Sequence, residues 1–423
     1  MENGFSAINN AASTGRKVDP LKVIIAGAGI GGLSAAVALR KAGHVVEIYE
    51  SSRFATELGA AIHLPPNVNA VLHRFGLDPS SFGANDTEWV SVFSSQGEII
   101  SRRSMAKLKE EYPHPWKLSH RVDLHEALKW AAVSPNGGGT PVTLNLQSKV
   151  VACDPSAPSL TLDNGVMVNG DLLIAADGVH STLRRAIAHE DIPAFPSGAS
   201  AFRFLVPIEK VKGNSVTRAL VEKPGDMQLW EGSHRRLVIY PCRHNTELNF
   251  VCLHPDHDSQ NSIEGWNNTA SVNDVSRVFQ EFYEPMRTLL GMADSETVKI
   301  WRLYDRGALK TWVNGYAALL GDAAHPFLPH QGQGGAQAIE DGAALGALFP
   351  LGTRKEEVPE RLNLYMQASD ADDVGGFSMD PLEFSKINFR HDAYLHAEAI
   401  LANHKDVVGT VQYHSPSAFP NRS

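Results

Sequence analysis

Short, continuous apolar runs that end near glycine occur in three widely separated parts of the chain. They are LKVIIAG at residues 21–27, GDLLIAADG at residues 170–178 and GYAALLGDAAH at residues 315–325. An apolar run of this length, bounded by glycine, is typical of a strand that is buried on both faces of a parallel sheet. The first run leads into helix-forming residues 31–43 and then into a second strand, HVVEIYE, at residues 44–50. The pattern therefore predicts a βαβ unit and two later strands in the same style.

A different pattern occupies residues 199–253, where apolar and polar positions alternate and few helices are expected. Alternation is typical of antiparallel strands with one buried face. The segments predicted to be strands are SAFRFLVPI, TRALVEK, MQLWEG, RRLVIYPCR and ELNFVCLHP. An earlier segment, TEWVSVFSSQGEII, predicts a hairpin around Gln96 and Gly97. The fold class is therefore α/β, with a nucleotide-binding type of domain interrupted by a mostly antiparallel sheet.

These changes of pattern define the expected domains. The polar residues 1–20 are expected to form a disordered tail. The other expected boundaries are 21–82, 112–195 and 301–350 for a discontinuous nucleotide-binding domain, 83–111 and 196–300 for the inserted substrate domain, and 351–423 for a C-terminal segment. In that segment ASDADDVGGFSMDP predicts a loop and RHDAYLHAEAILANH predicts a final helix.

A glycine-rich turn joins the first predicted strand to the first predicted helix. It contains Gly27, Gly29 and Gly32 in the spacing GxGxxG. Gly27 permits a tight turn, Gly29 lets a pyrophosphate approach the backbone, and Gly32 lets helix and strand pack closely. Glu50 ends the second strand, where a carboxylate can accept a hydrogen bond from a ribose hydroxyl. The combination predicts dinucleotide binding, with a glycine-rich packing turn as the alternative, and it does not separate FAD from NAD.

Two later aspartates occupy the same kind of position at strand ends. Asp177 precedes Gly178, and Asp322 follows Gly321 in the run GDAAHPFLPHQGQGG. A carboxylate at such a point can bind the hydroxyls of a second ribose or of a ribityl chain, while the small residues beside it leave room for a flat ring. These positions favour FAD over NAD.

The histidines of that run raise the alternative of a metal site. His325 and His330 are five positions apart, with Pro326 and Pro329 between them. The prolines argue against one regular helix face, and the chain contains no HExxH sequence and no CxxC pair. The sequence therefore predicts no metal site.

Composition and charge limit the classes of protein to which the chain can belong. The chain has 423 residues, of which 43% are hydrophobic and 20% charged, and its net charge is −9 at pH 7. Without an extended basic patch it is not expected to bind nucleic acid. The first 20 residues lack the apolar centre of a signal peptide, and no apolar run reaches the roughly 18 residues of a membrane span. Cys153, Cys242 and Cys252 form no CxxC, so a soluble, cytoplasmic protein is expected.

At the glycine turn and the two aspartate segments the chain resembles the group A flavoprotein monooxygenases of the para-hydroxybenzoate hydroxylase fold. Within that family it is most similar to salicylate hydroxylases and their fungal secondary-metabolite relatives. The resemblance runs from Val23 to Leu348. It implies a Rossmann-like FAD-binding domain, an inserted antiparallel β-sheet substrate domain and a helical C-terminus. It also implies bound FAD, with NADPH or NADH as a transient reductant.

The resemblance implies an FAD-dependent monooxygenase acting on a phenolic or salicylate-like aromatic molecule, in secondary metabolism. In that family NAD(P)H reduces the flavin, O2 adds at flavin C4a, and the hydroperoxide transfers oxygen to an electron-rich ring. Epoxidation or Baeyer–Villiger oxidation of an indole or polyketide is an alternative on the same scaffold, and a catalytically idle flavin-binding protein is another. The sequence separates neither these outcomes, nor NADPH from NADH, nor one oligomeric state from another.

The resemblance also assigns cofactor residues, position by position. Glu50 is expected at the adenosine ribose, Asp322 at the ribityl or pyrophosphate region, and Ala61 in a loop along the cofactor. Arg121, at a predicted helix start, is expected near the diphosphate or ribityl chain, with a plain surface arginine as the alternative. The glycines whose backbone N–H groups are expected near flavin N1 and O2 are Gly332, Gly334 and Gly335.

Arg203 and Tyr240 are the expected catalytic residues, because they lie on strands of the inserted sheet that covers the substrate in this family. Arg203 is expected to bind a substrate carboxylate or phenolate, and Tyr240 to donate to, or deprotonate, a ring hydroxyl. The alternatives are a salt bridge within the sheet and packing in the core. His63 and Pro329 are further candidates for substrate contact, the alternative for His63 being a plain loop histidine. After residue 369 the chain departs from the family pattern, so its C-terminal cover is expected to be shortened or rebuilt.

Overall fold

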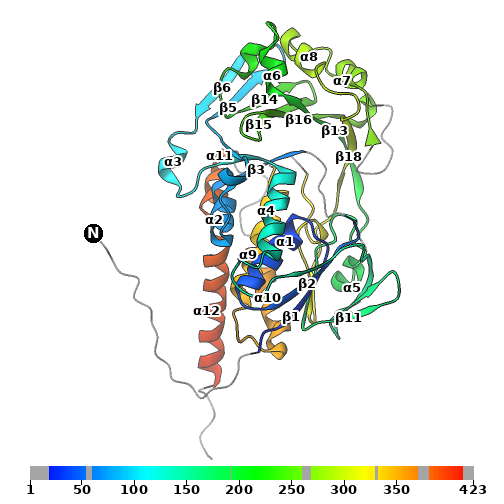
Figure 1. Ribbon diagram of the computed structural model, residues 1–423, viewed down its shortest axis with the longest axis vertical. Coiled ribbons are helices and arrows are strands. Elements are labelled where there is room, and N and C mark those ends of the chain that lie inside the picture. Colours follow the sequence, from blue (N-terminus) through cyan, green and yellow to red (C-terminus); the bar gives the residue numbers. More distant parts are fainter. Residues whose placement is uncertain are drawn as a thin grey trace, which may run out of the picture.

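The computed structural model describes residues 19–53, 60–190, 192–259, 268–328, 332–369 and 381–412. Six strands form a sheet in the lower half of the molecule, in the order β19-β20-β12-β1-β2-β8 (Figure 1). All neighbours pair in parallel except β19 with β20. The bounds are β1 Lys22–Ala26, β2 Val45–Tyr49, β8 Thr143–Asn145, β12 Leu172–Ala175, β19 Val313–Asn314 and β20 Ala317–Leu319. The predicted βαβ unit and the two later strands of its sheet are confirmed.

Helices cover one face of this sheet, and two of them approach at backbone distance. Val23 and Ile25 of β1 point into a core that includes Leu33 of α1 and Ile339 of α9. A Cβ at Gly342 of α9 would lie 2.6 Å from the backbone nitrogen of Ala35 in α1, so only glycine permits this crossing. The helices of this layer are α1 Ile30–Lys41, α2 Pro66–Phe75, α4 Arg121–Val133, α9 Gly334–Leu348, α10 Val358–Ser369 and α12 Ala393–Gln412.

The other face of the same sheet is covered by a three-stranded meander and a short helix. Ile24 of β1 and Leu173 of β12 pack there against Leu160 of the meander and Ile187 of the helix. The elements are β9 Val150–Asp154, β10 Ser159–Leu162, β11 Met167–Asn169 and α5 Arg184–Ala188. Strands buried on both faces explain the continuous apolar runs of the sequence.

A second, eight-stranded sheet lies at the top of Figure 1, in the order β17-β18-β13-β16-β15-β14-β5-β6. Its bounds are β5 Trp89–Ser94, β6 Ile99–Ser104, β13 Phe195–Pro207, β14 Asp226–Gly232, β15 Arg235–Cys242, β16 Glu247–Pro255, β17 Asn268–Thr269 and β18 Lys299–Asp305. Its outer face packs on α6 Ile208–Lys212, α7 Val272–Val278 and α8 Glu284–Leu290. The predicted antiparallel sheet and the β5–β6 hairpin are confirmed. The division into domains that the sequence suggests remains a prediction.

Strand periodicity sorts the residues of this sheet between its two faces. Phe202 and Phe204 of β13 face the helices, whereas Leu205 belongs to a separate cluster with Tyr240 on the opposite face. Because side chains alternate along a strand, Arg203 shares the face of Leu205. The two expected catalytic residues therefore lie on the face of the sheet that is turned away from helices α6 to α8.

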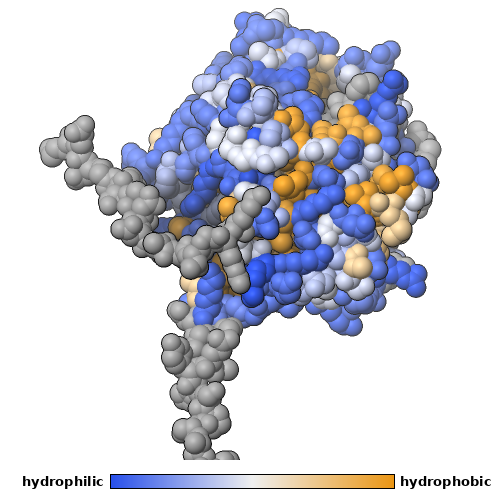
Figure 2. Space-filling model, turned by 60° about the horizontal axis from the view of Figure 1, so that its bottom comes forward, coloured by the Kyte–Doolittle hydropathy of each residue, from blue (hydrophilic) through white to orange (hydrophobic). Residues whose placement is uncertain are grey.

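Between the two large sheets lies a small one, of β3 Ala61–Leu64, β4 Asn85–Asp86 and β7 Lys117–His120. Two further short helices complete the described chain, α3 Leu108–Glu111 and α11 Pro381–Arg390. The surface is mostly polar, with apolar residues gathered on parts of the face in Figure 2.

Two predictions about local structure were wrong or incomplete. The segment TRALVEK is no strand but a single 3-10 turn, Arg218–Val221. Its polar groups form hydrogen bonds with residues nearby in the sequence: Thr217 Oγ1 donates to Val211 O, and Arg218 N donates to Asn214 O. The final helix is confirmed as α12, whereas α11 was not predicted. The predicted tail and the predicted acidic loop lie almost wholly outside the described residues.

The close helix crossing gives a test of the fold. Gly342→Ala should lower the free energy of unfolding by about 1–3 kcal/mol, because its Cβ meets the backbone of α1. Gly138→Ala is the control, since no described atom lies within 4 Å of a Cβ there. Urea unfolding followed by circular dichroism measures both. Equal stability of the two variants would contradict the packing described.

Candidate functional site

Four of the predicted cofactor residues lie at one edge of the six-stranded sheet, because each follows the carboxyl end of a parallel strand. Gly27 follows β1, Glu50 follows β2, Asp177 follows β12 and Asp322 follows β20. These four strands are direct neighbours in the sheet. Ligands of open α/β sheets bind at this edge. The topology thus assembles one site from segments that are far apart in the sequence.

The three glycines of the first turn are needed for different reasons. A Cβ at Gly27, whose φ is 99°, would overlap the carbonyl oxygen of Ala176, and a Cβ at Gly32 would overlap Gly27 O. At Gly29, in contrast, no described atom lies within 4 Å of a Cβ. Protein packing therefore requires glycine at two positions, while the third leaves open space beside the N-terminus of α1. This open cradle fits a pyrophosphate of FAD.

Glu50 lies beside that cradle and already bonds to it. Its Oε2 atom accepts from the backbone N–H of Ala28 at 2.8 Å, and its Oε1 atom accepts from Ser52 N at 2.7 Å. These bonds fix the carboxylate at the end of β2. A carboxylate held in this way retains lone pairs for ribose hydroxyls.

The two aspartate segments are tied together by a residue that sequence reasoning did not select. Asp177 Oδ2 accepts from Thr182 N at 2.9 Å and so closes the turn before α5. Arg184, which is buried, donates from Nε to Ala323 O at 2.7 Å and from Nη2 to Asp322 O and Val179 O. Its only sequence signal is its place in a basic pair after the first aspartate segment.

The glycine turn before α9 lies directly against strand β3. A Cβ at Gly332, whose φ is 63°, would overlap Nε2 of His63, and a Cβ at Gly335 would overlap the side chain of Ile62. Gly334 opens the helix, and a Cβ there would be 3.9 Å from Asp322 Oδ1. The bare backbone at this helix start thus lies next to His63 and Asp322, and its free N–H groups can receive negative charge.

Ala61, on β3, is held from two sides. Its backbone N–H donates to Oδ1 of Asn249 at 3.0 Å, and the adjacent Ala60 O accepts from the backbone N–H of Arg121 at 2.8 Å. Asn249 is fully buried on β16, opposite Tyr240 in register. It was not predicted, although a lone amide in the apolar strand ELNFVCLHP was the available signal. It connects the cofactor-side strand to the inserted sheet.

Arg203, Tyr240 and Arg121 are close enough for their charges to interact. Burial lowers the pKa of Arg203 to about 10, the nearby Tyr240 opposes this shift, and the positive charge of Arg121 adds to it. Burial raises the pKa of Tyr240, and Arg203 partly offsets the rise. The Arg203 guanidinium lies 4.3 Å from the ring centre of Trp301. Among the described residues, no carboxylate forms a salt bridge with Arg203, so the alternative role for this residue, a salt bridge within the sheet, is not observed.

A line of aromatic rings runs from the C-terminal helices to His63. Phe389 of α11 lies 5.3 Å from Trp116 and 5.8 Å from Tyr112 between ring centres, and Trp116 lies 5.7 Å from His63. Burial lowers the pKa of His63 to about 4, so its ring is neutral. Helix α11 packs on α2 and backs the His63 side of the site through this line of rings. The expected shortening or rebuilding of the C-terminal cover stays a prediction.

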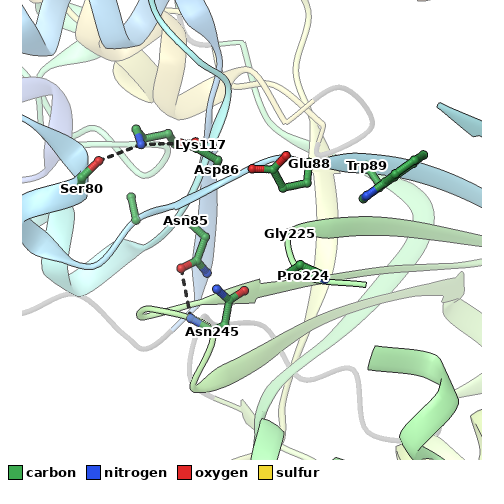
Figure 3. Close-up of a pocket in the computed structure, with 10 residues that line it drawn as sticks. Ser80, Asn85, Asp86, Glu88, Trp89, Lys117, Pro224, Gly225 and Asn245 are labelled. Atoms are coloured by element: carbon green, nitrogen blue, oxygen red, sulfur yellow. Dashed lines mark hydrogen bonds and ion pairs between the residues drawn. The ribbon is translucent and has the colours of Figure 1, made fainter. Parts of the chain in front are cut away.

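A surface pocket of about 410 Å³ lies elsewhere, between the small sheet and the start of β14 (Figure 3). Its lining includes Lys117, which is bonded to Asp86 at 2.6 Å and to Ser80 at 2.8 Å, and Asn85, which accepts from Asn245 N at 3.1 Å. None of the predicted site residues lines it. Its polar groups bind one another, so it does not define the functional site.

Within the described ranges, no group of three or more His, Cys, Asp or Glu side chains is arranged to hold a metal ion. His325 instead bonds to Asp341, whereas His330 and the predicted substrate residue Pro329 lie outside the described residues. Among the described helices, none has both the length and the apolarity needed to cross a membrane.

Fold and site together define a flavin-binding α/β protein, and comparisons with known proteins agree. The FAD binding domain family matches residues 20–371. Hispidin-3-hydroxylase of Neonothopanus nambi is 38% identical over 82% of this chain and 84% of its own length. The FAD-dependent monooxygenase cfoG of Aspergillus candidus is 36% identical over 82% and 81%. The crystal structure of CtdE with FAD and substrate superposes with a TM-score of 0.77 at 19% identity, covering 93% of this chain and 100% of that one.

The chain belongs to the FAD binding domain family. It is an FAD-dependent monooxygenase of that family, and FAD is its cofactor. The expected resemblance, fold class, enzyme class and cofactor are confirmed. The individual roles given to site residues remain predictions.

The different reasons for Gly29 and Gly32 can be separated by experiment. Gly29→Ala should raise the FAD dissociation constant roughly tenfold or more while leaving the unfolding free energy of the apoprotein unchanged. Gly32→Ala should lower that free energy by about 1–3 kcal/mol, because its Cβ overlaps Gly27 O. Flavin fluorescence titration and urea unfolding of the apoprotein measure the two effects. An unstable Gly29→Ala apoprotein would show that this position serves packing.

Proposed function

We propose that this monooxygenase hydroxylates a small phenolic or salicylate-like aromatic molecule, with NADPH or NADH as the transient reductant. The balanced reaction consumes one O2, one NAD(P)H and one proton, and yields the hydroxylated ring, NAD(P)+ and one water. Bound FAD supplies the redox chemistry that activates oxygen. Hydroxylation is supported by the hydroxylase among the relatives.

The observation that carries the proposal is the cation Arg203, whose side chain is half-buried and whose Nε atom is fully buried. A guanidinium in a buried position usually has a carboxylate partner, because an uncompensated buried charge is costly. None of the described carboxylates pairs with Arg203, whose Nε atom is buried without a hydrogen-bond partner in the described chain. Its cation therefore matches an anionic group of the substrate, a phenolate or a carboxylate. Holding a phenolate makes the ring more nucleophilic toward an electrophilic oxygen.

Tyr240 is proposed to act as a hydrogen-bond donor and not as a base. Because its pKa is raised, the phenol keeps its proton at neutral pH. A neutral tyrosine beside Arg203 can donate to the same substrate oxygen and orient the ring. His63, which is neutral at the glycine turn, and Pro329 are proposed to contact the substrate on the flavin side.

The proposed cofactor contacts follow the edge of the six-stranded sheet. Gly27, Gly29 and Gly32 would face the pyrophosphate, with Glu50 at the adenosine ribose. The residues proposed nearer the ribityl chain and flavin ring are Ala61, Arg121, Asp177, Asp322, Gly332, Gly334 and Gly335. The open cradle at Gly29 and the bare helix start of α9 support this arrangement.

We also propose a reducing compartment, the cytoplasm, as the location. Cys153, Cys242 and Cys252 are all free thiols, and two of them are buried in separate faces of the inserted sheet. Burial raises the pKa of Cys242 to about 12, which keeps that thiol protonated and unreactive.

The substrate class is tested with the purified FAD-loaded enzyme. NADPH and NADH oxidation are measured with salicylate, simple phenols, hispidin and indole, and products are identified by mass spectrometry under ¹⁸O2. We expect one ¹⁸O atom in a ring hydroxyl of a phenolic product. Tyr240→Phe should lower kcat/KM by roughly 10²-fold with FAD retained, whereas the exposed control Tyr283→Phe should match the wild type. NAD(P)H oxidation without product across all phenols would overturn the proposal.

The aromatic line from α11 predicts an effect on coupling. Phe389→Ala removes the ring that backs Trp116 and so loosens the His63 side of the site. The hydroxylated product formed per NAD(P)H should fall by roughly half or more, with peroxide making up the difference. Leu395→Ala, an exposed position on α12, is the matched control. Unchanged coupling in Phe389→Ala would show that α11 has no part in closing the site.

A further inference from the structure

A fully buried carboxylate lies beneath the segment that carries Asp322. Asp341, in the second turn of α9, is 0% exposed. Its Oδ2 atom accepts from Gly321 N and from His325 Nε2, each at 2.9 Å, and its Oδ1 atom accepts from Gln337 Nε2 at 3.2 Å. One carboxylate thus holds both ends of the short turn Gly321–His325.

We propose that Asp341 and His325 form a positioning ion pair that fixes the Gly321–Asp322 turn for FAD binding. Neither residue needs to touch the reacting atoms. The pair acts through the backbone of the turn, which sets where the Asp322 carboxylate lies. This inference depends on FAD binding alone and not on the proposed substrate.

The backbone of the turn is held by hydrogen bonds from both sides. Gly321 adopts a left-handed conformation, with φ of 60°, which its backbone N–H bond to Asp341 holds in place. Gly321 O accepts from Ala324 N and His325 N, and Arg184 holds the carbonyls of Asp322 and Ala323. The backbone of Asp322 is therefore fixed by Asp341 on one side and by Arg184 on the other. Loss of either contact should shift the backbone of Asp322 and, with it, the position of its carboxylate.

The charges of the pair matter because Asp341 is fully buried and His325 is largely buried. Burial by itself lowers the pKa of His325, but the charge and hydrogen bond of Asp341 outweigh it, so the pKa lies above its usual range. A raised histidine pKa means that the ion pair is complete at and below pH 6.5 and is lost as the pH rises through the folded-state pKa. Above that pH a neutral imidazole bonds Asp341 less strongly.

Other groups near the pair can titrate in the same range and must be separated from it. Glu340 adjoins Asp341 on α9, and burial raises its pKa to about 8. Burial and the charge of Asp341 raise the pKa of Tyr365, on α10, so that it stays neutral. Asp322 also interacts with His325. Trp312 and Phe327, which pack on His325, carry no charge.

Glu340 supplies a matched control. It is a buried acid on the same helix, but it faces α2, where its Oε1 atom accepts from Asn67 Nδ2 at 3.0 Å. Glu340→Gln removes a buried acid without touching the turn, and it also removes the second titration. The comparison with Asp341→Asn therefore isolates the pair.

The experiment measures the FAD dissociation constant of the apoprotein between pH 6 and 9 by flavin fluorescence. At pH 6.5, Asp341→Asn and His325→Gln should each raise it about tenfold or more, because each removes one charge of the pair and leaves the other without its counter-charge. Glu340→Gln should stay within about twofold of the wild type. The constant should rise with pH in the wild type and in Glu340→Gln, and it should be nearly flat in the other two variants.

Two results would overturn the inference. One is wild-type FAD affinity at pH 6.5 in both His325→Gln and Asp341→Asn. The other is a loss of affinity in Glu340→Gln as large as that in Asp341→Asn, since that would reflect general damage to α9. If Asp341→Asn fails to fold, His325→Gln alone decides the question, because it keeps an N–H donor while removing the charge and with it the pH dependence.

Discussion

The parallel pairing of β20, β12, β1 and β2 is the constraint on which the rest of the structure depends. It places the carboxyl ends of four strands side by side, so that segments from opposite ends of the chain contribute to one site. The apolar content of these strands is a consequence, since both of their faces are covered. The glycines at 27, 32 and 342 are consequences as well. Gly27 lies against the backbone that follows the neighbouring strand β12, Gly32 lets α1 approach the first turn, and Gly342 lets α9 approach α1.

In the inserted sheet, side chains alternate between the two faces with a period of two residues, and one of these faces is turned toward β3. Alternation along β13, β15 and β16 directs Phe202, Ile239 and Phe250 to the outer helices. The same alternation leaves Arg203, Tyr240 and Asn249 on the other face. Asn249 Oδ1 then accepts from the backbone N–H of Ala61, so the inserted sheet and strand β3 are joined by a buried hydrogen bond. The contact between the inserted sheet and β3 is thus made by a polar residue, Asn249, in the otherwise mostly apolar strand β16.

Much of this was predictable from the sequence, and the site residues that were missed share one cause. Gly27, Glu50 and Asp322 follow strands with strong local patterns, so their common edge could be inferred from the parallel fold. Arg184, Asn249 and Asp341 were missed because their roles depend on partners that are distant in the sequence and leave no periodic signal. The prediction of a strand at TRALVEK was wrong for the opposite reason. Its apolar residues suggest a strand, but hydrogen bonds to residues nearby in the sequence hold it as a 3-10 turn. Helix α11 follows a stretch with no usable pattern.

The two sides of the site compensate their charges in opposite ways, and the difference fits the roles that we propose for them. Asp341 is paired within the protein with His325, with the backbone N–H of Gly321 and with the side-chain amide of Gln337, so the turn it holds has a fixed shape before any ligand arrives. Arg203 has no carboxylate partner in the described chain and lies instead over the ring of Trp301, which compensates only part of the cost of burying a cation. A group that must stay in one place benefits from an internal counter-charge. The role proposed for Arg203, selection of an electron-rich ring, benefits from leaving that counter-charge to the substrate, because the ligand that completes the charge balance is then the one that binds best.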